Sequence, residues 1–227
     1  MYQYDWSLVP RAIPHLWVGM KVTLQITITA MVVGIALGTV LAIMRLSKSR
    51  VLSAISAGYV NLFRAIPLIM VLLWFFLIVP ALIERIFNLS RATDTRITSA
   101  LVAFSLFQAA YYAEIIRAGI QSVKAGQIGA AQALGMTFGQ SMRLVVLPQA
   151  FRNMTPLLLT QTIILFQDTS LVYVSAVPDF FGVANLVGTR DGRPVEMILF
   201  AGAVYFVICF ALSTLVKRWQ NRLKVAA

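Results

Sequence analysis

The sequence predicts an all-α membrane protein with five transmembrane helices in a single domain, residues 1–227. Of its residues, 59% are hydrophobic and 12% are charged, whereas soluble domains carry about 25% charged residues. Five apolar stretches, each close to the roughly 20 residues that cross a bilayer, are separated by short segments that hold most of the charges. This composition and spacing are typical of polytopic membrane proteins. The predicted helices are residues 22–44, 65–83, 97–116, 154–177 and 197–216.

The N-terminal segment, residues 1–21, contains Trp6, Pro10, Pro14 and Trp17 but few charges. Tryptophan is enriched at membrane–water interfaces, and proline interrupts helices. We therefore expect an amphipathic, proline-broken segment that lies on the membrane surface before the first span. The segment lacks the basic start, short apolar core and cleavage site of a secretory signal peptide.

The first span, residues 22–44, has no charged residue and carries Gly34-x-x-x-Gly38, continued by Ala42. Small residues at this spacing let another helix approach closely. The pattern favours packing inside the same subunit, and a contact between subunits is the alternative.

The other spans are recognised by where their apolar stretches begin and end. Residues 65–83 hold Pro67 near the start and Pro80 near the end, which neighbouring helices in a membrane tolerate by satisfying the freed backbone groups. The stretch 97–116 runs past one acid, Glu114, and the stretch 197–216 is uncharged. The fourth span, 154–177, follows Pro148.

The charged segments between the predicted spans fall into two groups. Residues 45–64, residues 117–152 and the C-terminus hold Lys and Arg without Asp or Glu, whereas the other three segments hold both signs. The positive-inside rule therefore places the N-terminus outside and the C-terminus in the cytoplasm, with residues 117–152 inside. The net charge of +11 is spread over these clusters, and no single basic face points to nucleic acid.

The sequence argues against several chemistries. His15 is the only histidine and Cys209 the only cysteine, so the chain has no Cys/His metal site and no internal disulfide. The sequence contains neither the Gly-x-x-x-x-Gly-Lys-Ser/Thr phosphate loop nor the Gly-x-Ser-x-Gly nucleophile elbow. We therefore expect no cofactor on this chain and no enzymatic activity.

Residues 117–152 include the one long polar segment, rich in small residues, between the apolar spans. Residues 127–134 are good helix formers with small side chains, and they predict a thin rod that enters a groove of a partner. Gly135 supplies a bend after the rod, as glycine does at helix ends. The alternative is a solvated loop with a short helix. The residues whose spacing matters are Ala130, Ala131, Gly135, Val145, Leu147 and Pro148.

The fourth predicted span carries a polar face. Asp168 precedes Pro178 by about ten residues, or roughly 15 Å at 1.5 Å per residue, which places its carboxylate near the middle of the bilayer. A carboxylate there costs ~2.5 kcal/mol or more, so we expect it to face a cavity or a cation. The face lines a substrate path, or else it seals a contact between subunits. The candidate path residues on this span are Gln161, Gln167, Asp168, Thr169 and Ser170.

Three further charges lie beside apolar stretches. Glu114 pairs with Arg117 three residues later, or with Arg64 across helices, and a structural or gating ion pair is favoured over contact with substrate. Arg64 is the stronger candidate for binding a ligand, because a guanidinium holds a carboxylate through two hydrogen bonds.

The spacing in residues 129–148 resembles the cytoplasmic signature of the membrane subunits of ATP-driven, binding-protein-dependent importers. That signature reads Glu-Ala-Ala, three residues, Gly, nine residues, Ile, one residue, Leu-Pro. Here Gly129 replaces the Glu and Val145 the Ile, so any ion pair that the Glu makes with the ATPase is absent. Other stretches look like polar amino-acid importer permeases, most of all glutamate/aspartate permeases. They are Phe63–Pro67, Tyr111–Gln121, Leu147–Arg152, Gln167–Tyr173 and Arg190–Met197.

The resemblance implies the type I ABC importer permease fold, called MetI-like, in a bacterial cell inner membrane. The implied partners are a second homologous permease subunit, a dimer of ATP-binding subunits and a periplasmic amino-acid-binding protein. ATP and Mg²⁺ are then bound by the ATPase, to which residues 129–148 couple this chain. In the path, Asp168 would receive the substrate ammonium and Arg64 a carboxylate.

Other functions stay open at this point. In one alternative, the chain transports another polar amino acid, either glutamine or a basic one. In another, the binding protein alone selects the substrate, and the path through this chain is a nonspecific conduit. An ion-coupled secondary carrier that titrates Asp168 and Glu114 is less favoured, because the sequence shows no inverted repeat and such a carrier has no use for the signature segment.

Overall fold

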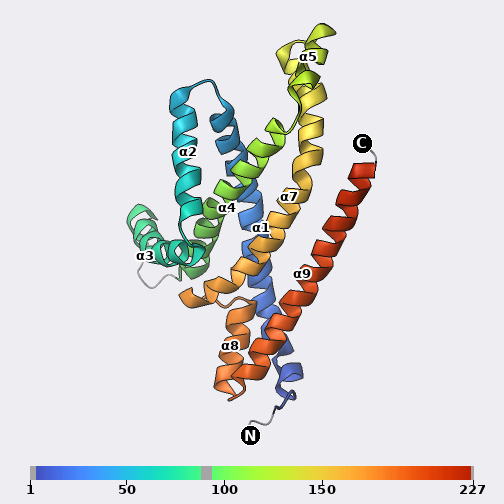
Figure 1. The fold of residues 1–227 in the computed structure, drawn as a ribbon. Coiled ribbons are helices and arrows are strands. Elements are labelled where there is room, and N and C mark those ends of the chain that lie inside the picture. Colours follow the sequence, from blue (N-terminus) through green and yellow to red (C-terminus); the bar gives the residue numbers. More distant parts are fainter. Residues whose placement is uncertain (1–3, 88–93, 226–227) are drawn as a thin grey trace.

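The computed structural model describes residues 4–87 and 94–225, and the elements in these ranges are helices (Figure 1). Four of them are long: α1 (Leu8–Leu46), α4 (Arg96–Gln121), α7 (Leu147–Asp168) and α9 (Pro194–Val225). The shorter α-helices are α2 (Arg50–Ala65), α3 (Leu68–Phe87), α5 (Ala125–Ala133), α6 (Phe138–Ser141) and α8 (Phe180–Arg190). A π-helical turn, η1 (Met142–Val146), precedes α7, and a 3₁₀ helix, η2 (Thr169–Ser175), follows it.

Within the described ranges, four helices are long and apolar enough to cross a membrane, and the bent pair α2–α3 makes a fifth span if it crosses as one unit. The prediction of a helical membrane protein is thus confirmed. The helix expected at 65–83 is α3, which begins at Leu68, and it qualifies as a membrane span only together with α2. The axes of α2 and α3 differ by 106° at Ile66–Pro67. Proline has no N–H and pushes the preceding residue out of helical geometry, and Ile66 is extended, with φ −104° and ψ 135°.

Helix α1 begins at Leu8 and continues through Pro14 to Leu46. The expectation of a proline-broken segment over residues 1–21 is therefore wrong from Leu8 onward. Pro10 lies in the first turn of α1, where proline is tolerated. Pro14 lies inside the helix, and the packing of Ala12 and Leu16 against α8 and α9 stabilises the helix on both sides of it. Helix α3 likewise continues past Pro80 to Phe87.

The centre of the molecule is the contact between α1 and α4. Gly34 and Gly38 face α4, where a Cβ atom on Gly38 would lie 2.9 Å from the backbone nitrogen of Ala113. A Cβ atom on Gly34 would lie 3.1 Å from the Tyr112 ring. The small residues of the first span therefore serve packing inside this chain, as the sequence favoured.

Helix α8 is fastened to α1 by a buried polar contact. Asp179, the N-cap residue of α8, accepts hydrogen bonds from the backbone N–H groups of Phe181 and Gly182. The N–H of Phe180 donates to Oγ1 of Thr23, 3.0 Å away on α1. At Gly19 a Cβ atom would lie 2.7 Å from the Asp179 carbonyl oxygen, so the two backbones meet there without a side chain between them.

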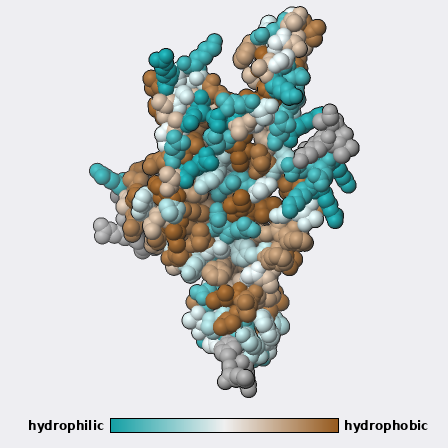
Figure 2. Space-filling view, in the orientation of Figure 1, coloured by the Kyte–Doolittle hydropathy of each residue, from teal (hydrophilic) through white to brown (hydrophobic). Residues whose placement is uncertain are grey.

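The two ends of the molecule differ in what they carry. Figure 1 places α5 and the C-terminus at one end, and the N-terminus and α8 at the other. In Figure 2 hydrophilic residues gather around the α1–α2 turn, residues of both kinds lie around α5, and hydrophobic residues cover α3. The end with α5 and the end with α8 thus lie on opposite sides of the apolar surface of α3.

Candidate functional site

A cavity of about 410 Å³ opens where the α2–α3 break meets α4 and α7. The break supplies consecutive backbone positions to its wall, α4 supplies two aromatic rings, and α7 supplies an amide and a carboxylate. The lining residues are Arg64, Ala65, Ile66, Pro67, Leu68, Phe107, Tyr111, Gln161, Ile164 and Asp168.

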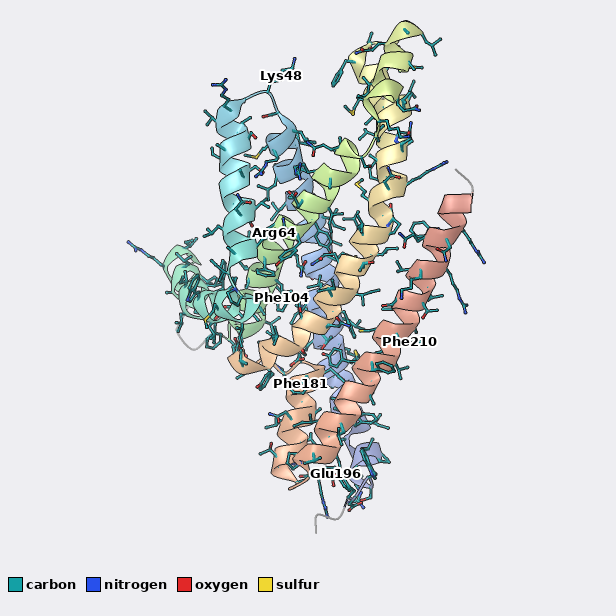
Figure 3. All side chains as sticks on the ribbon, viewed as in Figure 1. Lys48, Arg64, Phe104, Phe181, Glu196 and Phe210 are labelled. Carbon is teal, nitrogen blue, oxygen red and sulfur yellow. The ribbon has the colours of Figure 1, made fainter. Side chains whose placement is uncertain are left out.

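Arg64 brings a positive charge to this cavity from the last turn of α2. Its guanidinium carbon lies 5.6 Å from the centroid of the Tyr111 ring on α4, a cation–π geometry. Figure 3 shows Arg64 at the end of α2, next to α4. Within the described ranges the guanidinium makes no hydrogen bond, so its donors are available to an anion.

Asp168 brings a negative charge to the same cavity from the C-terminal residue of α7. Its side chain is half-buried, and no ion pair joins it to Arg64 or to another cation in the described residues. The cavity thus holds two opposite charges that do not neutralise each other. A ligand that carries both charges fits this arrangement.

Gln161, two turns before Asp168 on α7, also lines the cavity. Its Nε2 donates to Oε1 of Gln108 on α4, 2.9 Å away. Gln108 is fully buried and was not among the residues singled out from the sequence. The available signal was an amide within the uncharged stretch 97–113, because polar groups in a membrane span are costly.

The predicted polar face of the fourth span is divided by the structure. Gln167 and Ser170 line a second cavity of about 290 Å³ with Phe181, Ile198, Gly202 and Tyr205. Thr169 is buried, and its hydroxyl donates to the carbonyl oxygen of Phe166, 2.7 Å away. The α-helix ends at Asp168, and the 3₁₀ helix that follows has three residues per turn. Gln167 precedes this change, and as the neighbour of Asp168 it points about 100° away around the α-helix, so it does not share the face of Gln161 and Asp168.

Glu114 and Arg117 form the expected ion pair on α4. Arg117 donates from Nε to Oε2 of Glu114, 3.0 Å away, and from Nη2 to Oε1. Both side chains are partly buried, and Nη1 of Arg117 also contacts Oε1 of Gln121. The pair stands apart from the cavity lining, and Arg117 rather than Arg64 is the hydrogen-bonded partner of Glu114.

The signature segment forms a rod, a bend and a second short helix. Gly135 follows α5 with φ +83°, a conformation that glycine adopts without strain. Thr137 then caps α6, and its side chain and that of Gln140 exchange hydrogen bonds with each other's backbone in a capping box. Pro148 stands in the first turn of α7. The rod, the bend at Gly135 and the place of Pro148 agree with the sequence prediction.

The rod has one face fixed to the chain and one face free. Ala131 is 4% exposed, and Ile128 packs on a small core of Val123, Val146 and Ala150 at the base of α7. Gly129, Ala130 and Gly135 are exposed, Pro148 is exposed, and Val145 and Leu147 are half-buried. Leu134, directly after the rod, is 82% exposed, so the chain leaves a large apolar side chain uncovered there.

Comparisons with known proteins agree with this arrangement. A family model described as "Binding-protein-dependent transport system inner membrane component" matches residues 34–225. The glutamate/aspartate import permease protein GltK of Escherichia coli O6:H1 is 58% identical over 222 residues, which cover 98% of this chain and 99% of that protein. The arginine transport system permease protein ArtQ of Bacillus subtilis is 33% identical over 220 residues, which cover 97% of this chain and 97% of that protein.

Solved structures share the fold. The crystal structure of an amino acid ABC transporter with histidines matches with a TM-score of 0.86 and 29% identity, over 97% of this chain and 100% of that one. The inward-facing MetNI methionine ABC transporter matches with a TM-score of 0.71 at 17% identity, over 97% and 99% of the two chains. The fold is thus the MetI-like fold of ABC importer permeases. The chain belongs to the family of binding-protein-dependent transport system inner membrane components, and it is a transport subunit rather than an enzyme.

Proposed function

We propose that this chain is the permease subunit of an ATP-driven importer of L-glutamate and L-aspartate. One structural observation carries the proposal: Arg64 and Asp168 line a single cavity, and within the described ranges neither forms a salt bridge. An amino acid is a zwitterion, and its ammonium and carboxylate groups satisfy both charges at once. The similarity to GltK supports the proposal that the transported amino acid has an acidic side chain.

In the proposed complex the substrate ammonium lies at Asp168 and Gln161, and a carboxylate lies at Arg64. The fork of a guanidinium binds a carboxylate through two parallel hydrogen bonds. The cavity volume of about 410 Å³ falls within the roughly 300–1,000 Å³ of small-molecule sites. Gln167 and Ser170 face the second cavity, where we assign them to a contact with a second homologous permease subunit, and Thr169 supports the bend between α7 and α8.

The proposed orientation has the N-terminus outside and the C-terminus in the cytoplasm. The basic segments 45–64 and 117–152 support it, as does the position of α5 and the C-terminus at one end in Figure 1. A separate dimer of ATP-binding subunits, which binds ATP and Mg²⁺, receives α5 and the exposed Leu134. A periplasmic amino-acid-binding protein docks at the other end, on residues 178–196.

The test is the ATPase activity of the complex, purified through a tag on this chain and reconstituted in lipid. Binding protein loaded with L-glutamate or L-aspartate should stimulate hydrolysis, and Gly135→Arg should abolish the stimulation because φ at this position is +83°. Gly126→Ala is the matched control, since a Cβ atom there meets no neighbour within 4 Å. Stimulation by binding protein loaded with glutamine or arginine instead would support an ATP-driven importer but contradict the proposed substrates. Loss of all co-purifying ATPase in gentle detergent would argue for a secondary carrier.

A further inference from the structure

We propose that Gln108 is a positioning residue, which holds the amide of Gln161 so that its carbonyl oxygen accepts a hydrogen bond from the substrate ammonium. The inference rests on the proposed function of the cavity between α2, α4 and α7. Gln108 does not line the cavity, and its proposed role is to hold the Gln161 amide so that the oxygen of that amide faces the substrate.

The two amides hydrogen-bond each other, and this contact holds the side chain of Gln161 at the cavity wall. Its Nε2 donates to Oε1 of Gln108, 2.9 Å away. The remaining Oε1 of Gln161 has no donor among the described residues, and it is not one of the buried atoms without a partner. Because Gln161 lines the cavity, this oxygen is the part of the amide that is available there. A carbonyl oxygen accepts hydrogen bonds and donates none, so it suits an ammonium and not a carboxylate.

The surroundings of Gln108 fix its position. The side chain is 0% exposed, and it lies against the place where α1 crosses α4. A Cβ atom on Gly34 of α1 would lie 3.2 Å from the Cβ of Gln108, so the backbone of α1 approaches this residue closely. A site residue is oriented best by a neighbour whose own conformation is locked by packing.

Packing alone does not account for a glutamine at this position. The Nε2 atom of Gln108 is buried and has no acceptor among the described residues, and an unpaired buried donor lowers stability. An apolar side chain of equal length avoids that cost. The helices are also joined by a second hydrogen bond, one turn beyond Gln108 on α4 and one residue beyond Gln161 on α7, in which the hydroxyls of Tyr112 and Thr162 are 3.0 Å apart. A glutamine at position 108 therefore lowers stability relative to an apolar residue, although another polar contact already joins α4 to α7.

The second acceptor for the ammonium is close by on the same helix. Asp168 follows Gln161 by seven residues, or two turns, and both line the cavity. Residues at this spacing share a helix face. An ammonium has three N–H donors, so a carboxylate and a carbonyl oxygen together receive two of them. A ligand without the ammonium gains nothing from Gln161 in this orientation.

The experiment compares L-glutamate with glutarate, which has the same two carboxylates and no ammonium. Each is titrated against the nucleotide-free complex in lipid nanodiscs, without binding protein, and binding is followed by saturation-transfer difference NMR. Gln108→Met, of similar length but without an acceptor, should weaken L-glutamate about tenfold, the effect of one hydrogen bond to a charged group. The affinity for glutarate should not change. Gln108→Glu keeps an acceptor oxygen and should restore binding of L-glutamate.

Two controls separate positioning from a merely structural role. Tyr112→Phe removes the neighbouring hydrogen bond between α4 and α7 and should leave the ratio of the two affinities unchanged. In the background of Gln161→Met, the change Gln108→Met should have no further effect on L-glutamate, because residues that act through one another are not additive. If Gln108→Met does not assemble, Gln108→Asn withdraws the oxygen by one methylene, and the same ratio is measured.

The outcomes distinguish this inference from the function on which it rests. If Asp168→Asn and Gln161→Met both leave the affinity for L-glutamate unchanged, the cavity is not the substrate site and both proposals fall. If those variants weaken L-glutamate while Gln108→Met does not, the cavity stands and the positioning role is overturned. An equal loss for L-glutamate and glutarate in Gln108→Met also overturns it, since that loss reports damage to the fold.

Discussion

The guanidinium of Arg96 donates from Nη1 to the carbonyl oxygen of Ala176, 2.7 Å away. Ala176 ends η2 in the left-handed conformation, with φ 54°, and α8 starts four residues later. Asp94 holds the same guanidinium through Nε and Nη2. The start of α4 is thereby tied to the bend that follows α7, which is the helix that carries Gln161 and Asp168.

The tie between Arg96 and Ala176 should persist over the whole neutral and mildly acidic range. Hydrogen bonds from Arg96 lower the pKa of Asp94 from its ordinary value to about 2. A carboxyl group with a lowered pKa stabilises the fold above its ordinary pKa and loses that contribution as the pH falls toward the lowered value. Hydrogen exchange in residues 169–179 should therefore show no effect of this group between pH 5 and 8, whereas Asp94→Asn should speed exchange modestly at pH 7, because exposed ion pairs contribute little. A loss of protection in the unmodified chain already at pH 5, reversed by Asp94→Asn, would contradict this assignment.

Gly38→Ala should destabilise the protein, and Gly58→Ala should not. A Cβ atom on Gly38 would lie 2.9 Å from the backbone nitrogen of Ala113, and overpacking of this kind typically costs about 1–3 kcal/mol. A Cβ atom on Gly58, in the middle of α2, meets no atom within 4 Å, so alanine there should stabilise the helix by roughly 0.5–1 kcal/mol. Thermal unfolding of the purified complex measures both. Equal effects of the two changes would show that α1 and α4 do not approach as closely as described.

Leu134→Ser should weaken the attachment of the ATP-binding subunits. The side chain is 82% exposed at the tip of the rod, and full burial of a leucine contributes about 1.5–3 kcal/mol, which corresponds to at least a tenfold change in affinity. Val51→Ser is the control, because Val51 is 67% exposed at the start of α2 and lies outside the rod. The amount of ATPase that co-purifies with each variant gives the answer. Retention equal to the unmodified chain in Leu134→Ser would remove this residue from the coupling contact.

Asp168→Asn should slow uptake at least tenfold without changing the affinity of the binding protein for its ligand. The substitution keeps the size of the side chain and removes the charge that the ammonium meets in the cavity. Uptake into proteoliposomes is measured at saturating loaded binding protein, alongside basal ATPase activity, which should stay the same. Uptake with an unchanged rate and an unchanged half-saturating concentration would exclude Asp168 from the path.

Several features of the fold were predictable because each depends on local chemistry. Gly135 marks the end of the rod, and Pro148 marks the start of α7. The ion pair of Glu114 with Arg117 follows from their spacing on one helix. These inferences need only the side chains of a few neighbouring residues.

Other features depended on tertiary contacts that a sequence does not display. Helix α1 continues through Pro14 because its N-terminal part packs on α8 and α9, which lie far along the chain. Gln167 and Ser170 lie on a different side of the helix from Asp168, and they line a separate cavity with residues of α8 and α9, although the three residues are close in sequence. The contact of Gln108 with Gln161 joins residues that are 53 positions apart, so the sequence alone did not indicate it.

The break at Ile66–Pro67 gives the cavity a charge pattern that no side chain supplies. The C-terminal end of α2 and the N-terminal end of α3 both lie in its wall, at Arg64–Leu68. The end of a helix dipole amounts to roughly half an elementary charge, negative at the C-terminus and positive at the N-terminus. The last carbonyl groups of α2 and the first N–H groups of α3 therefore lie close together at one wall of the cavity. In the proposed site, the backbone therefore offers a partial negative charge to the ammonium group of a zwitterion and a partial positive charge to its carboxylate.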